Sequence, residues 1–114
     1  MNTLLEAYAE VAGADVVQHL IQLAAPLRGM KVVHVNSTRA GGGVAEILHK
    51  LVPLMQALEL DTRWEVITGD VRFYQCTKAM HNGLQGQPAP LSDVLLQAYE
   101  DANARTAETL APVL

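Results

Sequence analysis

The chain has 114 residues, of which 50% are hydrophobic and 18% charged, and its formal net charge is −4. This length allows one ordinary domain at most, and the high apolar content excludes disorder as the main state. The acidic balance and the single cysteine exclude a basic nucleic-acid-binding surface and an internal disulfide framework. No signal peptide and no apolar run of roughly 20 residues is visible. We therefore expect a cytoplasmic location, with neither a membrane nor a nucleic acid as partner.

The first half of the chain predicts two helices, a strand, a loop and a third helix. Apolar spacing indicates a short helix over 4–11 and a longer one over 16–27, with Asp15 as its N-cap. The β-branched run 31–36 (KVVHVN) predicts a buried strand, and 37–43 a glycine-rich loop. From 44 to 58 a wide apolar stripe predicts a helix packed on a sheet, kinked by Pro53.

The second half predicts one strand and two helices. Residues 62–68 (TRWEVIT) are typical of a strand, and 70–72 of a turn with local ion pairing. A helix is expected over 73–84, and 87–90 (QPAP) form a linker. Ser92 then caps a long helix that reaches about Leu110.

The order strand, loop, helix, strand predicts an α/β fold. A parallel pair with a right-handed crossover is the opening unit of a doubly wound, Rossmann-like sheet. We expect a single domain over 1–114, made of a helical lead-in (1–30), a strand-loop-helix-strand-helix unit (31–86) and a long helix (91–110). Two strands expose unpaired edges and make no stable sheet alone. The chain is therefore expected to begin a larger domain, or to associate as a homo-oligomer through its sheet edges.

The glycine loop is the main candidate for ligand binding. It leaves a strand and enters a helix, where α/β folds bind ligands, and its glycines and free helical N–H groups favour close contact. The loop matches neither the dinucleotide fingerprint nor the Walker A pattern, so a structural turn stays open beside a ligand loop. Arg39 is either a phosphate contact or a solvated residue. Glu46, the third helical residue if Gly43 is the cap, either complements the helix dipole or accepts hydrogen bonds from sugar hydroxyls.

Residues 34–38 (HVNST) and 41–48 (GGGVAEIL) resemble the glycosyltransferring trehalose synthases. The resemblance continues through 63–67 (RWEVI) and 81–86 (HNGLQG) and spans nearly the whole chain. It implies a retaining glycosyltransferase of the GT-B type, with two Rossmann-like domains, of which this chain covers the first part of the acceptor-side domain. Retaining trehalose phosphorylases open similarly, so the two reactions are not separated. A non-enzymatic, self-associating α/β module is the alternative of another class.

The resemblance also implies partners and site residues. A nucleotide-glucose donor and glucose or trehalose would be bound, without a cofactor or metal, and we expect the isolated chain to be inactive. No catalytic residue is identified. Contacts to the donor phosphate or sugar are expected from the loop and helix start, at Arg39, Gly41, Gly42, Gly43 and Val44. Contacts to the acceptor sugar are expected from Glu46, His81 and Asn82.

Several residues have simpler interpretations. His81 and Asn82 also fit a helix C-terminus, where histidine suits the dipole. His34 is expected to be a hydrogen-bonded strand histidine, and Trp64 to pack in the core rather than to stack on a sugar. Cys76 is expected to be a small buried residue. Glu46 and His49 share a helix face, but one such pair does not predict a metal site.

Overall fold

The computed structural model describes residues 2–114 and confirms the α/β fold class. The chain divides into two compact units, with the boundary between Glu65 and Val66, and each unit is described by itself. The expected single domain over 1–114 stays a prediction.

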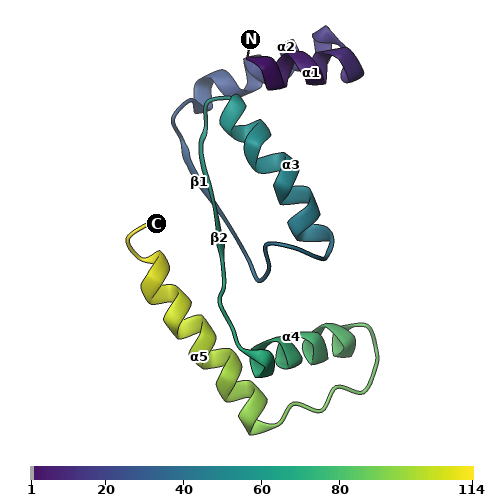
Figure 1. Ribbon diagram of the computed structural model, residues 1–114, viewed down its shortest axis with the longest axis vertical. Helices are drawn as coiled ribbons and strands as arrows, with labels where there is room; N and C mark the ends of the chain where they lie inside the picture. The colour runs from purple at the N-terminus through teal and green to yellow at the C-terminus, as the bar shows by residue number, and fades with distance from the viewer. Residues whose placement is uncertain (1) are drawn as a thin grey trace. The chain divides into compact units, whose positions relative to one another are not determined.

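The first unit carries three helices and the strand pair (Figure 1). Its elements are α1 (Thr3–Ala12), α2 (Ala14–Ala24), the short 3-10 turn η1 (Ala25–Leu27), β1 (Lys31–Asn36), α3 (Gly43–Ala57) and β2 (Asp61–Val66), the last residue of which begins the second unit. The second unit carries α4 (Val71–Leu84) and α5 (Asp93–Leu110). All predicted helices and strands are present, and Ser92 caps α5 as expected, accepting a hydrogen bond from the Leu95 amide at 3.3 Å.

Three predicted element starts are wrong. Asp15 is not a cap, because Gly13 (φ 100°) is both the C-cap of α1 and the N-cap of α2. Asp15 therefore lies in the first turn of α2. The cap of α3 is Gly42 and not Gly43, so Glu46 is the fourth helical residue. Asp70 does not open a turn over 70–72. It caps α4 through a 2.9 Å hydrogen bond from the Phe73 amide, and the helix begins at Val71.

The strands β1 and β2 form a parallel two-stranded sheet, and α3 lies alongside it (Figure 1). The two strands are joined where they begin, since the Asp61 amide donates a hydrogen bond to the Met30 carbonyl at 2.9 Å. Helix α3 contacts the first strand through Met55, whose sulfur lies 3.3 Å from His34 Nε2. Its buried residues are Ala45, Leu48 and Val52. The expected burial of β1 is wrong: its residues are half-buried or exposed. β1 has a single neighbouring strand in the described residues, so no second strand flanks its side chains.

The second unit has an aromatic core. Phe73 is 2% exposed, and its ring is stacked on Tyr99 with centroids 6.0 Å apart and planes at 9°. Cys76 and Ala102 are fully buried, which confirms the expectation for the cysteine. Gly69, just before the cap of α4, lies against the Phe73 side chain. The unit is thus held by packing between α4 and α5.

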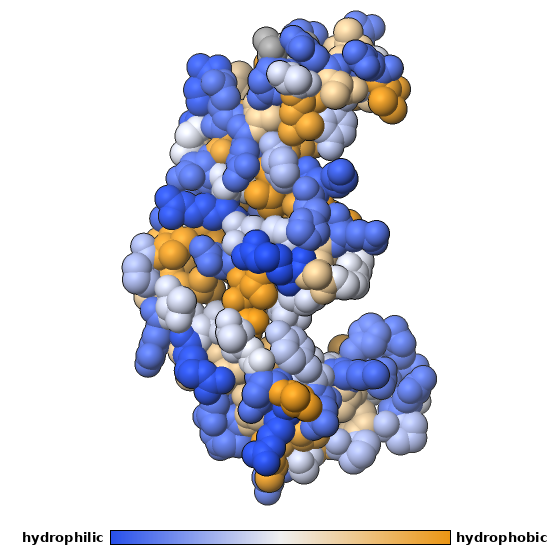
Figure 2. Space-filling view, viewed as in Figure 1, coloured by the Kyte–Doolittle hydropathy of each residue, from blue (hydrophilic) through white to orange (hydrophobic). Residues whose placement is uncertain are grey.

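Large apolar side chains are also exposed. On α3, Val44 and Ile47 are 59% and 61% exposed, although they belong to its predicted apolar stripe. The visible face in Figure 2 accordingly shows orange, apolar patches among blue, polar ones. Within residues 2–114, no helix combines the length and apolarity that crossing a membrane requires.

Candidate functional site

The loop over 37–42 joins the carboxyl end of β1 to the amino end of α3. Gly41 and Gly42 have φ angles of 78° and 84°, which other residues rarely adopt, so the turn itself requires glycine at both. A Cβ atom added at Gly41, Gly42 or Gly43 would meet nothing within 4 Å. The glycine loop is therefore both a structural turn and an open surface at which a ligand can approach the backbone.

Helix α3 starts without a side-chain cap. The helices α1, α4 and α5 have an Asn2, Asp70 or Ser92 oxygen that accepts a hydrogen bond from their first turn. In contrast, the N-cap residues of α2 and α3 are Gly13 and Gly42, which have no side chain to do so. The first amides of a helix need partners and carry the positive end of its dipole. The amino end of α3 is therefore suited to an acceptor group brought by a ligand.

Asn36 ties the beginning of the loop to the second strand. Its Oδ1 atom accepts a hydrogen bond from Trp64 Nε1 at 2.7 Å, and its Nδ2 atom donates to the Thr38 carbonyl at 2.7 Å. Both hydrogen bonds would be lost if the Oδ1 and Nδ2 atoms of the amide exchanged places, so they fix the orientation of the amide. The side chain of Thr38 in turn bonds to the backbone of Ala40. The first half of the loop is thus pinned to β2.

Arg39 is held in the loop at both its backbone and its side chain. Its carbonyl lies 2.7 Å from His49 Nε2, and because a carbonyl only accepts, this nitrogen carries a proton. Its guanidinium carbon lies 4.8 Å from the ring centroid of Trp64. The His49 ring meets the same indole edge-on, with centroids 4.8 Å apart and planes at 82°. These residues, with Asn36, form one cluster that we call the Trp64 cluster.

Among the described residues, no carboxylate forms an ion pair with Arg39. Arg28 pairs with Glu59 at 2.7 Å, and Arg63 approaches Asp61 at 3.7 Å. Arg39 forms no ion pair with any residue in the range 2–114. A guanidinium offers five N–H donors in a plane that suits phosphate. Arg39 beside the start of α3 is therefore a favourable place for an anion.

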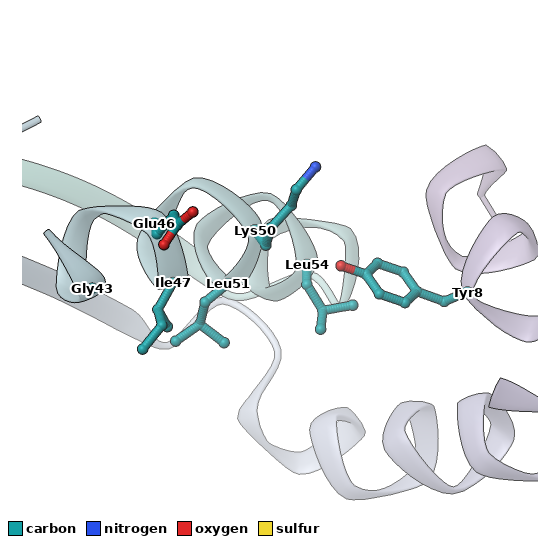
Figure 3. A pocket seen from close by; sticks show the side chains of 7 residues that line it. All are labelled: Tyr8, Gly43, Glu46, Ile47, Lys50, Leu51 and Leu54. Carbon is teal, nitrogen blue, oxygen red and sulfur yellow. The ribbon is translucent and has the colours of Figure 1, made fainter. Parts of the chain in front are cut away.

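An apolar groove borders the other side of α3. Its volume is about 670 Å³, and it is lined by Tyr8, Gly43, Glu46, Ile47, Lys50, Leu51 and Leu54. Figure 3 shows Tyr8 reaching from α1 toward Leu54, while Ile47 and Leu51 lie on one side of α3 and Lys50 extends away. Glu46 thus lines a groove that also contains Gly43, the first residue of α3.

His81 and Asn82 lie in the second unit, in the last turn of α4. His81 is exposed and Asn82 half-buried. The Asn82 carbonyl accepts hydrogen bonds from the Gln85 and Gln87 amides at 3.1 and 3.0 Å, which confirms the helix-terminus interpretation. The structure brings the loop residues and Glu46 together in the first unit, whereas a sugar-binding role for His81 and Asn82 stays a prediction.

The sequence reasoning missed the parts played by Asn36, His49 and Trp64. Trp64 is half-buried and contacts polar partners, so the expected core packing is only partly correct. The available signal was the position of Asn36 and Trp64 near the carboxyl ends of neighbouring parallel strands. His34 behaves as expected, with its Nε2 atom 3.3 Å from the Met55 sulfur. No group of three or more His, Cys, Asp or Glu side chains able to hold a metal occurs in the described range 2–114.

A family profile described as "Trehalose synthase, N-terminal domain" matches residues 34–113. The chain belongs to this family. The match includes the glycine loop, the Trp64 cluster and both helices of the second unit. It therefore connects the site described above with the resemblance seen in the sequence.

Individual relatives agree with this family. The chain is 43% identical to a trehalose synthase of Thermococcus litoralis over 107 residues, which cover 93% of this chain and 26% of the relative. It is 41% identical to a trehalose synthase of Rubrobacter xylanophilus over 104 residues, or 91% and 25%. A trehalose phosphorylase of Pleurotus pulmonarius is 41% identical over 88 residues, or 75% and 12%. The chain thus spans about a quarter of the trehalose synthases it matches.

Proposed function

We propose that this chain is the acceptor-side part of a trehalose synthase that transfers glucose from a nucleotide-glucose donor to glucose. The observation that carries the proposal is the family match over 34–113, together with relatives named trehalose synthase at 41–43% identity. In this reaction the glucose–diphosphate bond breaks and a bond to the acceptor hydroxyl forms. The nucleoside diphosphate leaves with a negative charge that the enzyme must stabilise.

The glycine loop supplies that stabilisation in our proposal. Backbone N–H groups from Gly41 to Val44 contact the donor phosphate or sugar, supported by the uncapped start of α3 and the open space at each glycine. Arg39 adds a positive charge that pairs with no carboxylate within residues 2–114. For the acceptor sugar, we propose hydroxyl contacts from Glu46 in the first unit and from His81 and Asn82 in the second.

A trehalose phosphorylase is the second candidate. It is favoured by the phosphorylase of Pleurotus pulmonarius, which is 41% identical over 88 residues. That reaction uses inorganic phosphate and trehalose. The same glycine loop suits inorganic phosphate as well as the phosphate of a nucleotide-glucose donor. A self-associating, non-enzymatic module is the third candidate, supported by the exposed apolar residues of α3.

The deciding experiment begins with the gene. The relatives are about four times longer than the matched region, so the reading frame beyond the codon for Leu114 is determined first. The encoded protein is then assayed with nucleotide-glucose plus glucose, and in parallel with trehalose plus inorganic phosphate. We expect trehalose in the first assay and none from the 114-residue chain alone. Activity only in the second assay would establish the phosphorylase, and activity in neither would refute both enzymatic proposals.

A variant pair tests the loop in the active protein. Gly42→Val introduces a branched side chain at a φ of 84° in the open part of the loop, and we expect turnover to fall without unfolding. Gly29→Val is the control, because it adds the same side chain at a similar φ of 77° in open space outside the loop. Full activity of the Gly42→Val protein would refute the proposal that a ligand closely approaches the backbone of the loop.

A further inference from the structure

We propose that Trp64 and His49 are positioning residues for Arg39, and that they hold its guanidinium ready for the diphosphate of the donor. This inference rests on the proposed function. It goes beyond that function by assigning roles to two side chains from β2 and α3 that do not themselves belong to the loop.

The backbone of Arg39 is fixed by His49. The Nε2–H group of His49 donates to the Arg39 carbonyl at 2.7 Å, across ten residues of sequence. His49 lies on α3 and its ring contacts Trp64 of β2, so the helix carries the donor to the loop. The hydrogen bond thereby limits the motion of a loop whose glycines give it unusual freedom.

The side chain of Arg39 is fixed by Trp64. A guanidinium within about 6 Å of an indole centroid is attracted by the ring, and here the distance is 4.8 Å. The indole is itself held by its 2.7 Å hydrogen bond to Asn36 and by the edge contact with His49. The guanidinium lies over the ring, and some of its five N–H donors stay available for phosphate. Arg39 can therefore bind an anion without leaving the ring.

The consequence is preorganisation. A free arginine side chain loses rotamer entropy when it binds a ligand, whereas a stacked one has already lost part of it. Removing the ring should weaken an anion complex only as long as Arg39 is present. This dependence distinguishes a positioning role from a general structural role.

The test is a double-mutant cycle on the 114-residue chain, with pyrophosphate as the probe. Backbone amide shifts of Gly41 to Val44 in a ¹⁵N-labelled sample give the affinity at constant ionic strength, because salt screens such contacts. Arg39→Gln should weaken binding about tenfold or more, whereas the control Arg63→Gln removes an equal charge from β2 and should change little. Trp64→Leu should weaken binding about two- to fivefold, and should have no further effect in the Arg39→Gln chain.

Three further variants show whether a loss of binding comes from lost positioning or from unfolding. Trp64→Phe keeps an aromatic face for Arg39, and we expect its pyrophosphate affinity to stay within about twofold of the wild type. His49→Leu removes the donor to the Arg39 carbonyl and should weaken binding, whereas His49→Gln retains an Nε2–H group and should restore it. Amide signals of the first unit away from the loop show whether each variant is folded.

The outcomes separate this inference from the function on which it rests. If Trp64→Leu weakens binding equally with and without Arg39, or if His49→Leu binds as well as His49→Gln, the positioning role is refuted while the loop remains an anion site. If the wild-type chain shows no shift with pyrophosphate, both the positioning role and the proposed donor contacts of the loop fall. Coupling between Trp64 and Arg39, with rescue by glutamine at 49, establishes the inference.

Discussion

Gly69 should be intolerant of any side chain, even the methyl group of alanine. A Cβ atom there would lie 2.5 Å from Phe73 Cγ and 2.8 Å from Phe73 Cβ, with Cδ1 nearer still. Rotating the ring does not relieve a contact with Cβ, which is fixed to the backbone of α4. Either the Gly69 backbone or the first turn of the helix must therefore shift.

The cost follows from the burial of Phe73. The ring is 2% exposed and stacked on Tyr99, so it has no free space to move into. Overpacking a filled core costs about 1–3 kcal/mol, and deleting a buried Phe side chain costs about 3–5 kcal/mol. Since the overlap involves three atoms, we expect Gly69→Ala to lower the free energy of unfolding by about 2–3 kcal/mol.

Urea unfolding followed by helical circular dichroism measures this change. With a slope of about 1–3 kcal/mol per molar urea, the midpoint should fall by roughly 0.7–3 M. The double variant Gly69→Ala/Phe73→Ala is the matched test of cause. Alanine lacks Cδ1 and Cγ, the two atoms that the added Cβ would meet first, so the second substitution should cost less in the Gly69→Ala chain than in the wild type. A Gly69→Ala midpoint equal to that of the wild type, or additive effects in the double variant, would refute the reasoning.

Three more predictions concern caps and the loop. Asp70→Ala removes the cap of α4 and should lower the free energy of unfolding by about 1 kcal/mol in the same urea titration; an unchanged value contradicts the capping role. Asn36→Ala removes the acceptor of the Trp64 indole N–H, so hydrogen exchange of that proton should accelerate, and unchanged exchange would contradict the bond. Gly42→Ala places a Cβ at a φ of 84° and should cost about 1–2 kcal/mol, whereas Gly43→Ala, in the helix, should be neutral or stabilising in thermal unfolding; equal effects would contradict this difference.

The secondary structure could be predicted because its signals are local. The six residues of β1 and the capping serine of α5 follow directly from side-chain types. Asp15 was misassigned because the glycine before it takes a positive φ and serves two helices at once, which the preference for polar caps does not reveal. The exposure of β1 could not be read from its composition, since burial depends on how many strands join the sheet.

The candidate site could be predicted in part. A glycine-rich turn between a strand and a helix is visible in the sequence, and so is Arg39 within it. The Trp64 cluster is not, because it depends on the alignment of β2 beside β1 and on which face of α3 meets them. Trp64 is 28 residues from its hydrogen-bond partner Asn36, and no local pattern joins the two.

The position of Trp64 also makes the intrinsic fluorescence of the protein a probe of the glycine loop. It is the sole tryptophan of the sequence, so all indole fluorescence arises where the loop, β1 and α3 meet. The second unit contains tyrosines but no indole and is silent at the emission wavelengths of tryptophan. A change in emission intensity or colour therefore reports on the neighbourhood of the glycine loop, without a label and without interference from α4 and α5.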